Sequence, residues 1–495
     1  MVEGVKVFEG IPIVESRGTI PSAFSALSCD SRRLRPGDLF VALRGETFDG
    51  HDFLRAAAER NAGAAVVEQL GDLPSLPQIR VRDTLATLPR LAANFYNRPA
   101  DKLSLIGVTG SNGKTTSTYL LESIWKAAEE DIAIVGTIEY RYGNQRMEAS
   151  NTTPLPHEMQ QLLHDIVLAG HRRVVMEVSS HGIALHRIDE MEFETALFTN
   201  LSPEHLDFHK TMEQYRDTKK RLFTEYLRAD GTAVMNIDDP VGRQFVQELT
   251  GTNVVTYGLE READLTAHAI EVHATGNRFT IIFPDKSQAP VQSPLVGRHN
   301  IYNILGAVSV AWAYNISINV IQQGIEQFTA VPGRLEPVPN TRGKRIFVDY
   351  CHTPDALEKC LLALRELPHR HIVTLFGCGG DRDSSKRPLM GRIALKYSDR
   401  VIVTNDNPRT EDPLRIIRGI EEGMREAQGG YEVIPDRKKA IESGIRQMRP
   451  DDIFLIAGKG HETYQIIGRE KYPFDDRKVA RDILFEEGQG ASLWL

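Results

Sequence analysis

The chain has 495 residues, too many for one hydrophobic core, and its length favours three domains. With 41% hydrophobic and 25% charged residues it has the composition of a soluble globular protein, and no apolar run is long enough to cross a bilayer. The formal net charge of -8 argues against nucleic acid as its main partner.

The first residues lack the basic start and apolar stretch of a secretory signal, so we expect a cytoplasmic protein without a membrane partner. The four cysteines show no zinc-type spacing. We therefore expect free thiols at Cys29, Cys351, Cys360 and Cys378.

Residues 1–100 are predicted to form a small mixed α/β domain. Its clearest elements are a strand over residues 38–43 and a helix over residues 53–60. Residues 97–100 (Asn-Arg-Pro-Ala) interrupt the pattern and are a predicted linker.

Residues 101–332 are predicted to form a central domain in which apolar strands alternate with amphipathic helices around a mainly parallel sheet. A strand over 103–109 leads through a glycine turn into a helix over 114–127, and a second strand covers 174–178. Residues 331–334 (Val-Pro-Gly-Arg) have the composition of a hinge.

Residues 333–495 contain a second alternating set, which predicts a Rossmann-like α/β domain with strands over 345–348, 372–376, 400–404 and 453–457. Polar or glycine-rich segments follow these strands, and ligands of open α/β sheets bind at the carboxyl ends of strands. The predicted fold class is therefore α/β with three domains.

A glycine-rich loop joins the first central strand to its helix, as a phosphate-binding loop requires. Backbone N–H groups would surround the phosphates of ATP, Lys114 would neutralise them, and the Thr115 hydroxyl would ligate Mg²⁺. Val108 stands where a glycine is usual, and the alternative is an ordinary strand–turn–helix with an exposed lysine. The predicted ATP-binding residues of this loop are Gly110, Ser111, Asn112, Gly113, Lys114, Thr115 and Thr116.

This loop resembles that of the Mur ligase family, and further blocks extend the resemblance, in the family's order, over nearly the whole chain. They are Asp30-Ser31-Arg32, Glu177-Val178-Ser179-Ser180-His181, Thr199 to Asp207, Tyr215 to Lys219, Gly297-Arg298-His299-Asn300 with Asn303, Pro332 to Glu336, and Asp349 to Asp355.

The resemblance implies an ATP-dependent ligase that forms an amide bond through an acyl-phosphate. Because phosphoryl transfer to a carboxylate brings two anions together, divalent cations are needed, and Mg²⁺ prefers oxygen ligands. The resemblance places one ion at Thr115 and Glu177, and a second at His205 and a carbamylated Lys219. Taken singly, such residues are more often surface acids or solvated lysines. Together with Lys114 they form the predicted catalytic set.

The resemblance also implies that the last domain completes the nucleotide site. Asp349 matches a residue that contacts the ATP ribose, and Arg334 at the hinge would reach the phosphates on closure. Asn300 and Asn303 resemble adenine-side residues, although asparagine in a turn is the commoner case.

The incoming amino acid is expected to be meso-diaminopimelate, because Asp406-Asn407-Pro408-Arg409 resembles the motif of the family members that add it. A guanidinium can clamp the extra carboxylate that distinguishes diaminopimelate from lysine. The alternative for Arg409 is a surface arginine at a helix start, tied to Glu411. Further implied contacts are Arg382, Gly458 and Glu462, the last for the distal ammonium.

The acceptor is expected to be UDP-N-acetylmuramoyl-L-alanyl-D-glutamate. The resemblance implies contacts at Ser31, Glu46, Thr47 and Phe48 for the uridine end, and at Asn151, Thr152, Thr153, Ser179, Leu185 and Arg187 for the muramoyl peptide. Some members carry glutamine at the position of Leu185. The general base is not assigned, and a monomer is expected from the family.

Three alternatives stay open at this stage. A lysine-adding ligase of the same family is opposed by Arg409, and folylpolyglutamate synthetase by the muramoyl-type first domain. A non-catalytic scaffold with this fold is opposed by the complete predicted catalytic set.

Overall fold

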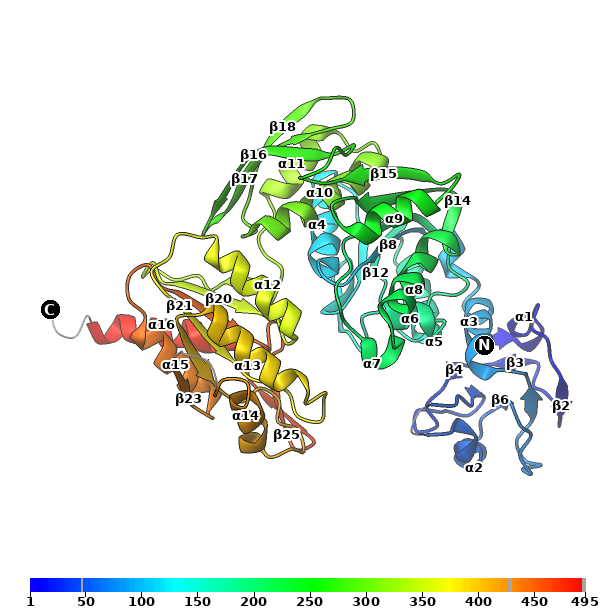
Figure 1. Cartoon of the computed structure of the whole chain (residues 1–495). Helices are drawn as coiled ribbons and strands as arrows, with labels where there is room; N and C mark the ends of the chain where they lie inside the picture. Colours follow the sequence, from blue (N-terminus) through cyan, green and yellow to red (C-terminus); the bar gives the residue numbers. More distant parts are fainter. Residues whose placement is uncertain (46–47, 426–429, 492–495) are drawn as a thin grey trace. The chain divides into compact units, whose positions relative to one another are not determined.

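The computed structural model describes residues 1–45, 48–425 and 430–491, and the chain divides into two compact units, residues 1–256 and 257–495 (Figure 1). The boundary between these units falls inside the region predicted as the central domain, so the division into 1–100, 101–332 and 333–495 stays a prediction. No helix in the described part of the chain is both long and apolar enough to span a membrane.

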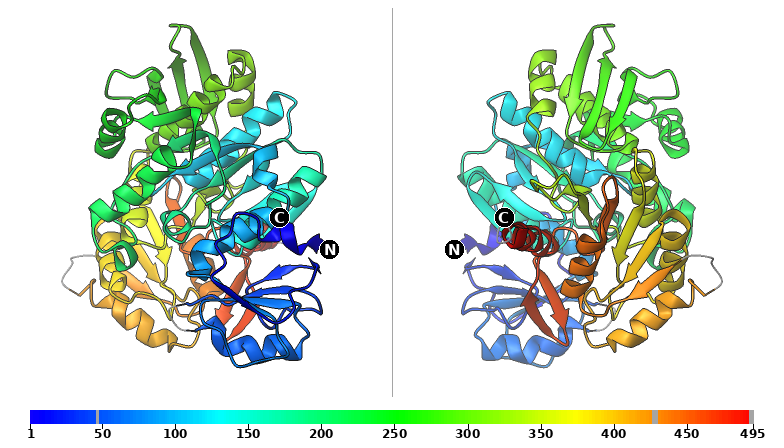
Figure 2. Two further views of the ribbon diagram at one scale, coloured as in Figure 1. Left: turned by 90° about the vertical axis from the view of Figure 1, so that its right-hand side faces the viewer. Right: turned by 90° about the vertical axis from the view of Figure 1, so that its left-hand side faces the viewer.

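The first sheet has five strands in the order β2-β7-β6-β5-β4, parallel except for β2 against β7. Helices α1 and α3 cover one face and α2 the other (Figure 2). Burial on both faces explains the apolar central strands. The bounds are β2 (Glu15–Arg17), β4 (Leu27–Ser28), β5 (Leu39–Val41), β6 (Ala64–Val67), β7 (Gln78–Arg80), α1 (Gly4–Val7), α2 (Leu54–Glu59) and α3 (Thr84–Phe95), with a small pair β1 (Val2–Glu3) and β3 (Ala23–Phe24).

Three predicted boundaries of this region differ from the structure. The strand predicted over 38–43 is shorter and covers Leu39–Val41. The predicted helix over 53–60 covers Leu54–Glu59 and is preceded by a 3₁₀ turn, η1 (Gly50–Phe53), in which the Asp49 side chain accepts a hydrogen bond from His51 N. The predicted linker over 97–100 runs into a second 3₁₀ turn, η2 (Pro99–Lys102), after two left-handed residues, Asn97 and Arg98. Proline at the first position fits such a turn because its missing N–H needs no partner there.

The second sheet has eight strands in the order β11-β10-β9-β12-β8-β13-β14-β15, and β9 to β14 in this order form a parallel ladder. Glu177, the last residue of β12, pairs with Val108 of β8, and Phe198, the last residue of β13, pairs with Thr109. Three strands therefore end together where the glycine loop begins. The strands are β8 (Ser104–Thr109), β9 (Ala133–Val135), β10 (Glu139–Tyr142), β11 (Gln145–Glu148), β12 (Arg173–Glu177), β13 (Phe193–Phe198), β14 (Leu227–Asn236) and β15 (Asn253–Tyr257).

Six helices follow the strands of this sheet. The predicted helix over 114–127 is confirmed, because left-handed Gly113 ends the loop immediately before the first helical residue. The helices are α4 (Lys114–Ala127), α5 (Pro156–Leu168), α6 (Ser180–Ala184), α7 (Leu206–His209), α8 (Met212–Thr224) and α9 (Pro240–Glu248).

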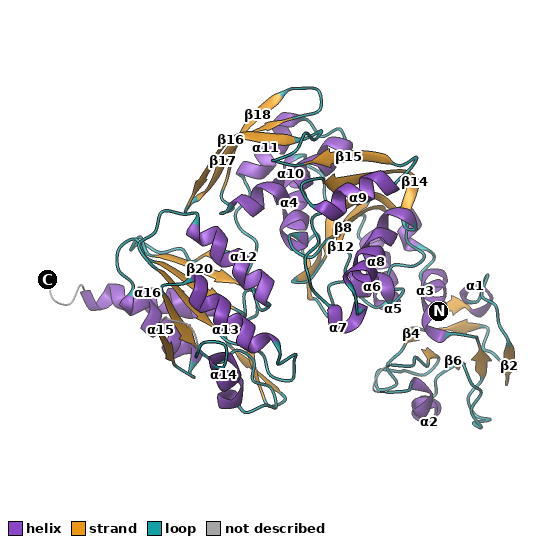
Figure 3. Cartoon of the chain, in the orientation of Figure 1, coloured by secondary structure: helices purple, strands orange, loops and turns teal. Residues whose placement is uncertain are grey.

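The second unit opens with a three-stranded antiparallel sheet, β16 (Thr266–His273), β17 (Gly276–Ile282) and β18 (Gln288–Ser293), followed by α10 (Arg298–Ala313) and α11 (Ile318–Glu326) (Figure 3). This sheet departs from the alternating parallel pattern predicted up to residue 332. The cause is visible in β18, where buried and exposed residues alternate, as in a sheet covered on one face only.

The last sheet has six strands in the order β19-β20-β24-β21-β22-β23, all parallel except β19. Helices α12, α13 and α14 pack on one face and α15 and α16 on the other (Figure 1). The predicted strands 372–376 and 453–457 are confirmed, and the other two differ by one residue. The bounds are β19 (Glu336–Pro337), β20 (Arg345–Asp349), β21 (Ile372–Phe376), β22 (Arg400–Val403), β23 (Tyr431–Val433), β24 (Ile453–Ala457), α12 (Pro354–Arg365), α13 (Lys386–Tyr397), α14 (Pro413–Glu421), α15 (Arg437–Gln447) and α16 (Asp476–Ala491), with a hairpin β25 (Tyr464–Ile467) and β26 (Glu470–Pro473).

Candidate active site

The glycine loop between β8 and α4 has the backbone of an anion-binding turn. Gly110 has φ 148° and Gly113 has φ 89°. A Cβ at Gly110 would clash with the Thr199 hydroxyl, so no larger residue fits there. Glycine at these positions lets the chain turn its N–H groups inward at the start of a helix, where the helix dipole favours negative charge.

The residues that follow β13 hold this loop in place. Asn200 accepts a hydrogen bond from Ser111 N through its carbonyl (2.8 Å) and from Asn112 N through its side chain (3.0 Å). Thr199 donates from its hydroxyl to Asn112 O at 2.6 Å. The sequence places Thr199 and Asn200 in a block that resembles the family but predicts no specific role for them. The structure assigns them the preorganisation of the loop.

Lys114 lies over its own loop and is not the exposed lysine of the alternative interpretation. Its Nζ donates to Gly110 O and Ser111 O, both at 2.8 Å. Thr115 and Thr116, in the first turn of α4, are buried. The Lys114 ammonium group therefore already lies at the loop where an anion would bind.

Glu177 is a buried carboxylate at the end of β12, with 1% of its surface exposed. Oε1 accepts from Thr137 N at 2.9 Å and Oε2 from the Thr137 hydroxyl at 3.0 Å. That hydroxyl is also 3.0 Å from the Thr152 hydroxyl, which joins Glu177 to a predicted acceptor-binding residue. In the described part of the chain, both donors to the Glu177 carboxylate belong to Thr137 and are uncharged. A buried carboxylate without a cationic donor is a suitable ligand for a metal ion.

Lys219 of α8 lies against the same loop, with 1% of its surface exposed. Its Nζ donates to Gly110 O at 3.0 Å and lies 4.7 Å from the centre of the Tyr215 ring. Burial, and then the charge of Lys114, lower the pKa of Lys219 well below its ordinary value. A neutral amine is the form that can react with CO₂, so this environment suits the predicted carbamate.

His205 immediately precedes α7 and has a left-handed conformation, and its ring lies 4.7 Å edge-on from that of His181. His181 lies 5.7 Å from His209, a third histidine that sequence reasoning did not select. Burial lowers the pKa of His205, and burial together with the neighbouring histidines lowers that of His181 to about 4. Neutral imidazoles can ligate metal ions.

These donors fit magnesium in kind. The Thr115 hydroxyl and the Glu177 carboxylate are the oxygen ligands that Mg²⁺ prefers. Lys219 fits only as a carbamate, since an ammonium group has no lone pair to donate and would repel the ion. His205, with its neutral ring, is the one nitrogen donor of the predicted set.

Three of the predicted acceptor-binding residues meet beside β12. The Thr153 hydroxyl lies 3.1 Å from that of Ser179, and Arg187 donates through Nη1 to Thr153 O at 2.8 Å. The buried Arg187 Nε has no hydrogen-bond partner among the described residues, so this guanidinium keeps a donor to offer. Leu185 closes helix α6, and Asn151 is held through its backbone by the Tyr140 hydroxyl.

The predicted uridine-end residues belong to the first domain. Ser31 is buried and Phe48 is 71% exposed. Glu46 and Thr47 lie outside the described residues. The roles of these four residues stay predictions.

Asp349 ties the hinge to the end of β20. Its carboxylate accepts from Leu335 N at 2.6 Å and from Cys351 N at 2.8 Å, and burial raises its pKa. Arg334 stacks over Tyr350, 5.2 Å from the ring centre. The structure therefore gives Asp349 a structural task at the hinge, and its predicted contact with the ribose is not tested.

Asn300 and Asn303 lie on the first turns of α10 and are buried. Asn300 donates through Nδ2 to Val296 O at 2.8 Å, and Asn303 donates to Asn300 Oδ1 at 2.9 Å. Both amides thus stabilise the start of α10. Their predicted adenine contact stays a prediction.

The loop after β22 presents Arg409 in a left-handed conformation. Its Nη1 donates to Gly380 O at 2.8 Å. Glu411 pairs with Arg387 at 2.9 Å, so the alternative that Glu411 holds Arg409 is wrong. One edge of the Arg409 guanidinium donates to a neutral carbonyl, and its charge acts on Asp381 of the neighbouring loop, with which no salt bridge forms among the described residues. Arg382, on the neighbouring loop, is exposed.

A compact polar network joins this loop to the one after β24. Asn407 donates through Nδ2 to Glu462 Oε2 at 2.8 Å, and Lys459 donates to Asn407 Oδ1 at 3.1 Å and to Glu462 Oε2 at 2.9 Å. Gly458, with φ 112°, lies so close to Asp406 that a Cβ would come within 2.7 Å of its carboxylate. Sequence reasoning missed Lys459, whose one signal was its place between two glycines at a strand end.

Behind the network, Arg437 and Asp476 form an ion pair in which both side chains are 0% exposed. Arg437 also donates to Asn405 O at 3.2 Å and to Ala457 O at 3.0 Å. These carbonyls precede the two loops just described, so the ion pair fixes where both loops start.

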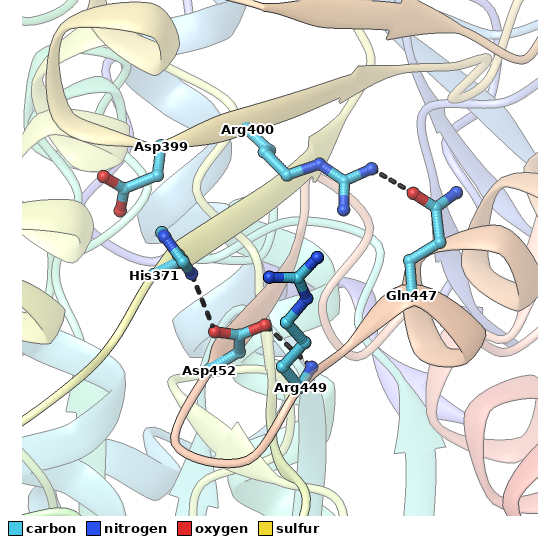
Figure 4. Close-up of a pocket in the computed structure, with 6 residues that line it drawn as sticks. All are labelled: His371, Asp399, Arg400, Gln447, Arg449 and Asp452. Carbon is cyan, nitrogen blue, oxygen red and sulfur yellow. Dashed lines mark hydrogen bonds and ion pairs between the residues drawn. The ribbon is translucent and has the colours of Figure 1, made fainter.

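A cavity of about 590 Å³ lies at the opposite edge of the same sheet, where β21, β22 and β24 begin (Figure 4). Its carboxylates are already engaged: Asp452 contacts His371 at 3.1 Å and accepts from Arg449 N, and Asp399 accepts from Ile372 N. The predicted diaminopimelate-binding residues follow the carboxyl ends of β21, β22 and β24, at the other edge of this sheet.

Comparison with known proteins follows the same domain order. Family models match residues 23–96 (Mur ligase family, catalytic domain), 108–311 (Mur ligase middle domain) and 333–460 (Mur ligase, glutamate ligase domain). A protein of Geobacter metallireducens named UDP-N-acetylmuramoyl-L-alanyl-D-glutamate--2,6-diaminopimelate ligase is 43% identical over 96% of this chain and 98% of its own. One of the same name from Geobacter sulfurreducens is 44% identical over 94% and 95%.

Solved structures agree. A structure of UDP-N-acetylmuramoyl-L-alanyl-D-glutamate--2,6-diaminopimelate ligase is 29% identical, with a TM-score of 0.69, and covers 99% of this chain and 100% of its own. MurF from Acinetobacter baumannii, at 21% identity, a TM-score of 0.65 and coverage of 94% and 95%, shows the same fold.

Proposed function

This chain belongs to the Mur ligase family, and from that premise we propose that it joins 2,6-diaminopimelate to UDP-N-acetylmuramoyl-L-alanyl-D-glutamate with the hydrolysis of ATP to ADP and phosphate. The product is the UDP-muramoyl tripeptide of peptidoglycan synthesis. The choice of amino acid rests on Arg409. Glu411 pairs with Arg387 and does not hold Arg409, and Arg409 lies in the same loop as Asn407, which donates a hydrogen bond to Glu462.

The reaction has two steps. The D-glutamyl γ-carboxylate attacks the γ-phosphorus of ATP, which forms the acyl-phosphate and releases ADP. The neutral amine of diaminopimelate then attacks the acyl carbon, and phosphate leaves as the amide forms. No residue is assigned as the base that takes the amine proton.

The first step needs the triphosphate to be held still and its charge reduced. The glycine loop, fixed by Thr199 and Asn200, would receive the phosphates, with Lys114 lying across them. Mg²⁺, held by Thr115 and Glu177 and by His205 with carbamylated Lys219, would supply positive charge to both anions. Arg334 and Asp349 would complete the nucleotide site when the hinge closes, with Asn300 and Asn303 at the adenine.

The acceptor would lie along Thr153, Ser179 and Arg187, whose mutual hydrogen bonds form a preorganised edge. Arg187, with a buried donor still unused, would bind the dipeptide carboxylate. The remaining predicted contacts are Ser31, Glu46, Thr47, Phe48, Asn151, Thr152 and Leu185.

The domain division is part of the proposal: 1–100 for the UDP-muramoyl group, 101–332 for ATP and 333–495 for the amino acid. The matched family regions at 23–96, 108–311 and 333–460 support it. We also propose that the protein acts as a monomer in the cytoplasm, where its nucleotide substrates are made. Light scattering of the purified chain tests the first point.

The proposal is tested by phosphate release from ATP in reactions from which each substrate is omitted in turn. We expect release only when ATP, the UDP-dipeptide and diaminopimelate are all present, with L-lysine a poor substitute. Release with L-lysine equal to that with diaminopimelate would contradict selection of diaminopimelate, and greater release with L-lysine would assign the chain to lysine addition. No release with any combination would indicate a non-catalytic scaffold.

A further inference from the structure

Lys459 is a wholly buried cation in the predicted amino-acid site. Its side chain is 0% exposed, and its Nζ contacts Glu462 Oε2 at 2.9 Å and Asn407 Oδ1 at 3.1 Å. Its ammonium also lies 5.7 Å from the centre of the Tyr464 ring. A lysine is rarely fully buried without a charged partner, and the partner of Lys459 is Glu462.

The pairing changes what Glu462 can bind. An isolated carboxylate would attract any ammonium group, including that of L-lysine. Beside a buried ammonium at 2.9 Å, much of this attraction is already used, and a second cation brought to Glu462 is also repelled by Lys459. Glu462 can therefore gain only a little from a lone ammonium.

The charges around the site match a zwitterion. Lys459 and Arg409 are positive, and Glu462 and Asp406 are negative. Asp381 and Arg382 on the neighbouring loop add one charge of each sign, so these six groups sum to zero. The distal end of diaminopimelate carries one ammonium and one carboxylate, and it adds no net charge. L-lysine brings the ammonium alone, which leaves Arg409 without a substrate carboxylate and adds a cation beside Lys459.

We propose that Lys459 is a specificity-determining residue, which acts through Glu462 to penalise an amino acid whose distal end carries an ammonium group without a carboxylate. This inference rests on the proposed function. Lys459 selects in the same direction as Arg409 but by a different means: Arg409 attracts the carboxylate, whereas Lys459 raises the cost of its absence.

The test compares kcat/KM for meso-diaminopimelate and for L-lysine in the wild-type chain and in Lys459→Met. We expect the preference for diaminopimelate to fall by about tenfold or more, because the Glu462 charge becomes available to the lysine ammonium. A purely structural role would lower both values by the same factor, and that result would overturn the proposal.

A matched control is Lys471→Met, which removes an exposed lysine 4.1 Å from the same Tyr464 ring. Its preference should equal that of the wild type, and an equal loss of preference in both variants would also overturn the proposal. Lys459→Arg should keep the preference because it keeps the charge. If the methionine variant does not fold, Lys459→Gln removes the charge while keeping a donor for Glu462, and the same fall is expected.

The kinetics of the wild-type chain distinguish a failure of the proposed function from a failure of the role proposed for Lys459. Failure to couple either amino acid contradicts the proposed function, whereas coupling of diaminopimelate with an unchanged preference in the charge-removing variants contradicts only the role of Lys459.

Discussion

Replacing Arg437 by methionine should destabilise the last domain more than any surface change. In the structure, Nε and Nη2 of Arg437 contact the two Asp476 oxygens at 2.8 and 2.7 Å, and neither side chain is exposed. The substitution leaves a buried carboxylate unpaired and removes the donors to Asn405 O and Ala457 O. Removing one partner of a buried ion pair costs about 3–5 kcal/mol.

Hydrogen–deuterium exchange of peptides that cover β22 and β24 measures this loss locally, which matters because a chain of several domains does not unfold in one step. At 1.4 kcal/mol per factor of ten, the expected cost corresponds to exchange faster by about a hundredfold or more in Arg437→Met. The double variant Arg437→Met/Asp476→Leu should recover most of the protection, since an apolar pair of similar volume is often neutral.

The control is Arg418→Met, which removes an exposed arginine paired with Asp412 at 3.5 Å. It should leave exchange of the same peptides unchanged, because exposed ion pairs contribute little. Unchanged exchange in Arg437→Met would refute the reasoning, as would a double variant no better protected than the single one.

Three further predictions concern the proposed site. Arg409→Ala should raise KM for diaminopimelate and lower kcat/KM about 10- to 150-fold, the worth of a charge-assisted hydrogen bond, and steady-state kinetics with unchanged KM would contradict this. Gly110→Ala should abolish ATP binding in calorimetry, since the new Cβ meets the Thr199 hydroxyl; wild-type affinity would show that the loop yields. Protein equilibrated with ¹³CO₂ should show a carbamate carbon resonance that Lys219→Ala lacks, and a resonance present in both would place the carbamate elsewhere.

Local sequence signals predicted those parts of the fold that depend on neighbouring residues. The helix over 114–127 follows a glycine, and the strands over 372–376 and 453–457 are mainly apolar and buried along their whole length. The antiparallel sheet β16–β18 was missed because its short alternating strands give a weaker signal than buried parallel ones.

The candidate site was predictable only as residue types at strand ends. The hydrogen bond between Lys459 and Asn407 joins positions 52 residues apart. Glu411 pairs with Arg387, 24 residues away, and not with Arg409, two residues before it. Such partners are selected by tertiary packing and leave no local pattern. The hydrogen bond of Asp349 to Leu335 at the hinge could not be predicted either, because Leu335 lies outside the strand that Asp349 ends.

The acyl-phosphate step is tested most directly with ¹⁸O in the D-glutamyl γ-carboxylate of the UDP-dipeptide. During coupling with diaminopimelate, one ¹⁸O atom should pass into the released phosphate, with ADP as the other product. Phosphate that carries no ¹⁸O, while the tripeptide still forms, would contradict transfer of the ATP phosphoryl group to that carboxylate.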